Sequence, residues 1–276
     1  MKKTIEANFL KMKVSFLHLS LISFLSLLSF YSFSCSKINR SIIKEDFRIS
    51  ITEYLNKQSK SIVIIVPPTG GENFIDRSYA KKLCNEGISA SILSRWTDSN
   101  EYSLEFEIHT RFYKRAQRAV SIIIKEYEKL YSISMLGTSV GGLHTAISCS
   151  RFKQISKCFT IVSGANISEI IANTSQEVLV DGKKKRFKMY NIKSDKAYLN
   201  KVKKAIPFEP LRLTPPKSKK LGMVLSKTDT VVPSKNQLQL KQLWKPKKYI
   251  ELNLSHTNSV IYTWLFKSHE VVNFFK

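Results

Sequence analysis

Three polar residues of the types that cooperate in acyl transfer each follow a stretch that predicts a buried strand. Ser139 lies in "GTSVGG", directly after Tyr131-Ser-Ile-Ser-Met-Leu136, and Asp229 and His256 follow the apolar runs "LGMVL" and "YIELNL". A serine hydroxyl becomes a nucleophile when a histidine takes its proton, and a carboxylate holds that histidine in the required tautomer. These residue types therefore predict nucleophilic attack on an acyl carbon.

The stretch around Ser139 fits the pattern G-x-S-x-G between a strand and a helix. Gly137 and Gly141 leave room for a tight turn that exposes the serine, and the start of the next helix adds a positive dipole beneath it. The alternative is an ordinary glycine turn. The glycines match neither the G-x-G-x-x-G of dinucleotide sites nor the GK[ST] of a P-loop.

Asp229 and His256 each have a structural alternative when taken singly. Asp229 stands in "SKTDTVVP", where an aspartate also suits a polar turn or a helix cap. Of the five histidines, only His256 directly follows an expected strand, although a lone histidine is often structural. We expect Asp229, rather than Asp195 or Glu209, to orient His256.

A glycine-rich turn, "PPTGG", follows the apolar run "SIVIIV". Backbone N–H groups of such a turn, near Thr69 and Gly70, can point at a developing oxyanion. A plain turn before a helix is the alternative.

These loops must be positioned by alternating strands and helices. Continuous β-branched runs predict buried strands, and apolar residues at helical spacing predict helices between them. The strands are expected at 61–66, 88–93, 131–136, 158–162, 221–225 and 249–254, and the helices at 74–86, 111–130, 142–150 and 259–275. This order predicts an α/β fold with a mainly parallel twisted sheet, helices on both faces, and ligands bound beyond the carboxyl ends of the strands.

From about Ser61 to Phe275 the chain resembles the α/β-hydrolase superfamily. The resemblance rests on "PPTGG", "GTSVGG", "DTVVP" and "SH", in the order serine, aspartate, histidine. It departs where the usual His-Gly of the oxyanion loop is Pro68-Thr69, and where Ser255 replaces a glycine common before the histidine. The resemblance implies a hydrolase domain over 61–276.

The resemblance also implies an activity, namely a serine esterase without cofactor or metal. Ser139, His256 and Asp229 would be nucleophile, base and acid, and the N–H of Val140 would bind the oxyanion together with one near Thr69 or Gly70. A cap-like insertion over 164–213, before the acid-bearing strand, would serve as a lid; helical decoration is the alternative. The rival function is a cell-envelope binding protein that keeps the fold without catalysis.

The first 35 residues have the layout of an export signal. Lysines precede the uncharged stretch Val14 to Phe33, and Ser34-Cys35 resembles the cleavage site of bacterial lipoproteins, which predicts lipid on Cys35. An uncleaved membrane anchor and an ordinary cleaved signal are the alternatives. All three place the domain outside the cytoplasm, in a cell envelope, and make residues 36–60 a linker and lead-in.

The chain carries a formal net charge of +24. No nucleic-acid module or basic stripe with interleaved aromatic residues accompanies it, so we expect no nucleic-acid partner. Attraction to an anionic membrane surface and ordinary solvated surface remain open. Cys149 and Cys158 either pair or stay as buried thiols, and no Cys/His cluster has metal-ligand spacing. The expected substrate is a small-molecule or lipid ester; the sequence indicates no oligomeric state.

Overall fold

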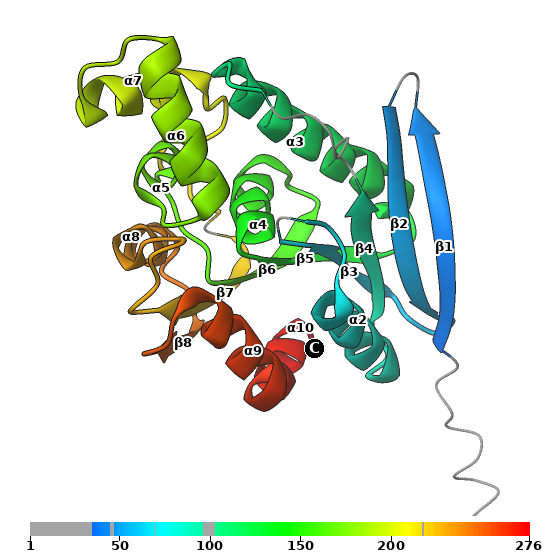
Figure 1. The fold of residues 1–276 in the computed structure, drawn as a ribbon. Helices are drawn as coiled ribbons and strands as arrows, with labels where there is room; N and C mark the ends of the chain where they lie inside the picture. The colour runs from blue at the N-terminus through cyan, green and yellow to red at the C-terminus, as the bar shows by residue number, and fades with distance from the viewer. Residues whose placement is uncertain (1–34, 45–46, 69, 96–102, 217) are drawn as a thin grey trace, which may run out of the picture. The chain divides into compact units, whose positions relative to one another are not determined.

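A sheet of eight strands forms the centre of the molecule in the computed structural model, which describes residues 35–44, 47–68, 70–95, 103–216 and 218–276 (Figure 1). The strand order is β1-β2-β4-β3-β5-β6-β7-β8. Strand β2 is antiparallel to both of its neighbours, and all other neighbours are parallel. The strands are β1 (Cys35–Lys44), β2 (Phe47–Asn56), β3 (Ser61–Val66), β4 (Ser89–Arg95), β5 (Ser132–Thr138), β6 (Ile155–Ile161), β7 (Lys220–Ser226) and β8 (Lys248–Leu252).

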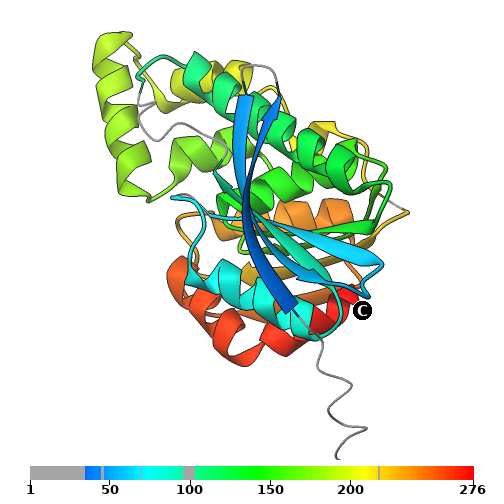
Figure 2. The same ribbon diagram turned by 90° about the vertical axis from the view of Figure 1, so that its right-hand side faces the viewer.

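Helices cover both faces of this sheet, as the sequence predicts (Figure 2). One face carries α3 (Glu107–Tyr127), α4 (Val140–Arg151) and α8 (Ser234–Trp244); the other carries α2 (Phe74–Asn85), α9 (His256–Phe266) and α10 (Ser268–Phe275). The central strands are apolar on both sides because both sides are covered: all of β3 after Ser61 is buried. The predicted α/β-hydrolase fold is confirmed at the level of architecture.

The predicted cap-like insertion is present between β6 and β7. It consists of α5 (Ile167–Asn173), α6 (Glu177–Met189), α7 (Asp195–Ala205) and the 3₁₀ turn η1 (Pro210–Arg212). Apolar side chains of α5 and α7, among them Ile170 and Val202, form a cluster with Leu143 of α4 and Tyr113 of α3. The insertion therefore packs on the helical layer, and its role as a lid over an acyl pocket stays a prediction.

Residues 36–60, expected to be a linker, instead supply β1 and β2. Most side chains of β1 are exposed because it is an edge strand, so its sequence lacks an apolar pattern. Strand β2 does carry a signal, the alternation of buried Phe47, Ile49 and Ile51. The export signal, residues 1–34, lies outside the described residues. No helix in the described part of the chain has the length and apolarity needed to cross a membrane.

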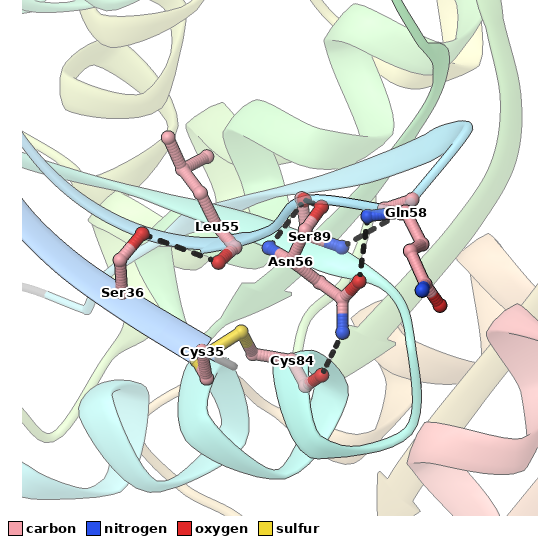
Figure 3. The surroundings of a disulfide bond; sticks show 8 residues. Cys35, Ser36, Leu55, Asn56, Gln58, Cys84 and Ser89 are labelled. Carbon is pink, nitrogen blue, oxygen red and sulfur yellow. Dashed lines mark hydrogen bonds between the residues drawn. A yellow bond between two sulfur atoms is a disulfide. The ribbon is translucent and has the colours of Figure 1, made fainter. Parts of the chain in front are cut away.

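The structure joins Cys35 to Cys84 and Cys149 to Cys158 by disulfides. The first bond fastens the beginning of β1 to the last turn of α2 (Figure 3), where Asn56 of β2 also donates to the Cys84 carbonyl at 3.3 Å. One sulfur atom cannot hold both a disulfide and a thioether to lipid. The disulfide thus contradicts the prediction that Cys35 is lipidated. No local sequence signal indicated this pairing, because the two cysteines are 49 residues apart.

We expect Cys84→Ser to lower the free energy of unfolding by about 2–4 kcal/mol, because the bond closes a long loop in the unfolded chain. Urea unfolding of the oxidised protein measures this loss. Cys35→Ser should cost the same amount, and the double variant no more, since all three remove one bond. Peptide mapping without reductant should find the two cysteines linked; a lipid-bearing Cys35 would contradict the assignment.

Candidate active site

Ser139, His256 and Asp229 come together in one hydrogen-bonded chain. The Ser139 Oγ lies 2.9 Å from His256 Nε2, and His256 Nδ1 lies 2.6 Å from Asp229 Oδ2. A carboxylate oxygen only accepts, so Nδ1 carries the hydrogen and Nε2 is left to accept from the serine hydroxyl. The three residues follow β5, β7 and β8, at the carboxyl edge of the sheet, where ligands bind in folds of this kind.

The backbone at Ser139 is strained. Its φ of 55° lies in the left-handed region, which is costly for a residue with a side chain. The Ser139 N–H donates to the Ile161 carbonyl at 2.9 Å, and α4 begins at the next residue. The sequence thus turns from strand to helix within one residue and leaves the serine at the tip of the turn, as the G-x-S-x-G pattern predicts.

Three glycines make this turn sterically feasible. A Cβ at Gly137 would overlap the Gly141 carbonyl, and one at Gly142 would overlap the Ser163 side chain. A Cβ at Gly141 would overlap the carbonyls of Val66 and Pro67. The loop after β3 therefore runs directly against the start of α4, beside the serine.

Asp229 is held from four directions. Its Oδ1 accepts from the N–H groups of Val231 and Val232 at 2.8 and 2.9 Å, and its Oδ2 accepts from Gln237 Nε2 at 2.8 Å as well as from His256. The Asp229 side chain is fully buried and that of His256 is 12% exposed. The carboxylate is thereby fixed against the imidazole while the imidazole stays within reach of solvent.

Gln237, which no sequence motif indicated, holds the Asp229 carboxylate in place. It is fully buried in α8; its Nε2 donates both to Asp229 and to the Val232 carbonyl at 2.8 Å, and its Oε1 accepts from the Ser226 N–H at 2.9 Å. One amide thus ties the end of β7 to the loop that carries the aspartate. A glutamine in the first turn of a helix gives no sequence signal of its own, which is why Gln237 was not predicted.

We expect Gln237→Ala to lower the rate of ester hydrolysis by about 10- to 100-fold, the scale of one hydrogen bond to a charged group. The loss should fall on kcat more than on KM, because Gln237 orients Asp229 and does not touch substrate. Steady-state kinetics measures it, with Gln239→Ala as the matched control, since that side chain contacts Asn236 instead. Equal rates in the two variants would refute this positioning role.

The two carboxylates weighed as alternatives to Asp229 do not contact His256 through a hydrogen bond. Asp195 is exposed and pairs with Lys183 at 2.7 Å, while Glu209 accepts from the N–H groups of Asn166 and Ile167 and so caps the start of α5. The buried histidines also have other surroundings. His144 packs against the rings of Phe112 and Tyr113, and burial lowers its pKa to about 3; burial and Arg186 lower the pKa of His109 to about 4.

The predicted oxyanion donors are only partly described. Val140 is the first residue of α4, so its N–H has no acceptor within that helix. Gly70 has a φ of 100° in the turn after Pro68, in the loop whose start contacts Gly141. Thr69 lies outside the described residues. The assignment of these N–H groups to an oxyanion stays a prediction.

The acid loop is also attached to the insertion. Thr174, at the end of α5, donates to the Val231 carbonyl at 2.7 Å, and the Ser175 N–H donates to the Thr230 carbonyl at 2.9 Å. Val140 and Val232, the neighbours of the serine and the aspartate loop, belong to the apolar cluster of α5. The apolar cluster of the insertion therefore extends to Val140, next to the candidate nucleophile.

Comparison with known proteins places this arrangement in a recurrent fold. No protein-family model and no curated protein matches the sequence, whereas many solved structures match the fold. An esterase of Pyrococcus furiosus has a TM-score of 0.58 at 16% identity, over 88% of this chain and 92% of its own. An α/β hydrolase of Penicillium has a TM-score of 0.62 at 15% identity, over 87% and 98%.

A larger protein shares the fold over part of its length. An acylaminoacyl peptidase of Pyrococcus horikoshii has a TM-score of 0.64 at 11% identity, over 90% of this chain and 43% of its own. These similarities concern the fold, which is that of the esterases and α/β hydrolases.

Proposed function

We propose that the protein is a serine hydrolase that cleaves carboxylic esters through an acyl-enzyme. The observation that carries the proposal is the series of hydrogen bonds from Ser139 Oγ through His256 to Asp229, which is buried and accepts four hydrogen bonds. A binding protein that merely kept the fold would have no need for a strained serine, an aligned imidazole and a buried carboxylate in series.

In the first half of the reaction, Ser139 Oγ forms a bond to the acyl carbon while its proton moves to His256 Nε2. The bond from that carbon to the leaving oxygen then breaks, and His256 returns the proton to the departing alcohol. Asp229 stabilises the imidazolium formed between these two steps and keeps Nδ1 protonated. The products of this half are an alcohol and an acyl-Ser139 ester.

In the second half, His256 takes a proton from water, whose oxygen attacks the acyl carbon, and the acid leaves as Ser139 recovers its proton. The oxyanion of each tetrahedral intermediate is assigned to the N–H of Val140 and an N–H of the loop at Gly70. Val140, which is half-buried and next to Ser139, is the apolar residue that would contact the acyl chain.

We further propose that the domain works outside the cytoplasm. The support is that all four cysteines of the chain form disulfides in the described residues, which is uncommon in a reducing compartment. The uncharged stretch Val14 to Phe33 would direct export, as an uncleaved anchor or as a cleaved signal.

The test is turnover of a series of p-nitrophenyl esters of increasing acyl length, alongside the matching p-nitroanilides. We expect release of acid and alcohol with saturation kinetics, and faster cleavage of the ester than of the anilide at each acyl length. Preferred anilide cleavage would assign a peptidase instead. Binding of the esters without any turnover would favour the non-catalytic binding protein.

A further inference from the structure

In helix α9 the fully buried residues are polar and large apolar residues are exposed. The two residues of α9 that are fully buried are Ser259 and Thr263, one turn apart, and the Thr263 hydroxyl donates back to the Ser259 carbonyl at 2.6 Å. Leu265 is 52% exposed, Phe266 is 67% exposed and Ile261 is exposed as well. A helix on the surface of a soluble domain ordinarily turns its apolar side inward.

The outward side chains form one continuous surface. At 100° per residue, Ile261 and Leu265 lie on the side of α9 that faces away from the sheet, and the half-buried Trp264 and Tyr262, which also pack against the core, flank them. Phe74, the exposed first residue of α2, extends this surface. Its ring meets that of Trp264 edge-on at 5.1 Å, and Trp264 Nε1 donates to Ser78 Oγ at 2.9 Å.

We call this surface the α9 face, and it comprises Phe74, Ile261, Tyr262, Trp264, Leu265 and Phe266. Two segments of the chain connect it to the candidate active site. His256 is the first residue of α9, so the apolar surface begins about one turn beyond the imidazole. Phe74 ends the loop that starts at Pro67 beside α4. His256 and Ile261 are thus about 8 Å apart along the helix axis, so a molecule held on the α9 face would lie within about two to three turns of the residue that carries the imidazole.

Charge indicates what covers the α9 face. The chain carries a net charge of +24, so two copies repel each other, whereas an anionic bilayer attracts each of them. Lys81 is exposed on the same side of α2 as Phe74 and Ser78. Lys267 directly follows Phe266 and pairs with Glu270 at 2.9 Å. Tryptophan and tyrosine beside lysine are the residues that settle at the boundary between lipid and water.

The start of the described chain lies near the same surface. Cys35 is bonded to Cys84 in the last turn of α2, and Phe74 is in its first turn. A helix of 12 residues is about 18 Å long. Cys35, the first described residue, is therefore about one length of α2 from Phe74, at one end of the α9 face.

We propose that the α9 face docks on an anionic lipid surface and presents the candidate active site to esters carried there. Docking itself does not depend on the proposed hydrolysis. It can be measured in full-length Ser139→Ala protein, so failure of one proposal is distinguishable from failure of the other.

The test places an environment-sensitive fluorophore on a new cysteine in the α9 face, Leu265→Cys, in the Ser139→Ala protein. The matched control is Leu130→Cys, an exposed leucine after α3 on the other side of the sheet. Vesicles of phosphatidylcholine with phosphatidylglycerol should shift the emission at position 265 to the blue and allow quenching by nitroxide lipids. Position 130 should show neither effect, and high salt or phosphatidylcholine alone should weaken the effect at 265.

Four outcomes would overturn the proposal. Bound protein without a change at 265 would mean that residues 1–34 alone hold the membrane, and equal changes at 265 and 130 would mean unspecific adsorption. A blue shift without vesicles would indicate a second copy on the face if it grows with protein concentration, and the chain's own N-terminal segment if it does not.

A paired substitution gives a second, label-free measurement. Leu265→Asp with Phe266→Asp should lower the part of the vesicle-bound protein that high salt releases by about tenfold or more, because it replaces two apolar side chains with charges that an anionic surface repels. Hydrolysis of soluble short-chain esters should stay unchanged, since neither residue contacts Ser139, His256 or Asp229 through a hydrogen bond. Undiminished vesicle binding in this variant would also overturn the proposal.

Discussion

Ser139→Ala should lower kcat for ester hydrolysis by about 10⁵- to 10⁶-fold, the scale seen when the nucleophile of a serine hydrolase is removed. The variant lacks the only atom that forms the acyl-enzyme bond, so neither His256 nor Asp229 can act through it. Binding of substrate should change little, because the removed hydroxyl is small and the surrounding apolar surface is kept. Steady-state kinetics on the preferred p-nitrophenyl ester measures the loss.

Ser163→Ala is the matched control for that substitution. Ser163 is also buried near the turn that carries Ser139, against Gly142, and it has no hydrogen bond to His256. Its loss should leave kcat within a few-fold of the wild type. A comparable collapse in both variants, with folding intact by circular dichroism, would mean that the effect at Ser139 is not that of a nucleophile.

Asp229→Asn should lower kcat by about 10³- to 10⁴-fold while the protein stays folded. The amide can donate as well as accept, so it favours the wrong imidazole tautomer and cannot stabilise the imidazolium. The N–H groups of Val231 and Val232 would still donate to the remaining oxygen of this isosteric side chain and keep the loop in place. Single-turnover kinetics isolates the acylation step.

Asp195→Asn serves as its control, because that carboxylate is exposed and pairs with Lys183. We expect wild-type turnover from it. Near-normal acylation in Asp229→Asn would rule out Asp229 as the residue that orients His256.

The sequence was sufficient to predict the parts of the fold that are buried on both sides. Strand β3 and the inward side of α3 were predictable because continuous or periodic apolar residues have few alternative structures. Strand β1 was not, because an edge strand needs no apolar pattern. The predicted helix over 259–275 is two helices, α9 and α10, separated at Lys267, and no proline or glycine marks that break.

For the candidate site, local motifs were informative and distant partners were not. Gly137 and Gly141 made Ser139 conspicuous, because only glycine fits where the strand end crosses the helix start. Asp229 and His256 could be selected because each directly follows a strand. Gln237 and the partner of Cys35 could not, because their contacts join elements whose proximity only the folded chain creates.

The unusual composition of α9 illustrates the same limit. Its sequence, "HTNSVIYTWLF", is apolar enough to suggest a core helix, yet the sheet contacts its small polar residues, Ser259 and Thr263. Which side of such a helix faces the core is decided by its neighbours, and here Trp264 is held against α2 by Phe74 and Ser78.

The central claim is that Ser139 is an activated nucleophile, and labelling with a fluorophosphonate probe tests it most directly. The probe phosphonylates a serine only when a base accepts its proton, so it reports activation without requiring the natural substrate. Mass spectrometry of the labelled protein should find one phosphonate, on the peptide that contains Ser139, and His256→Ala should abolish it. Folded wild-type protein that stays unlabelled, or carries the probe on another residue, would contradict the account.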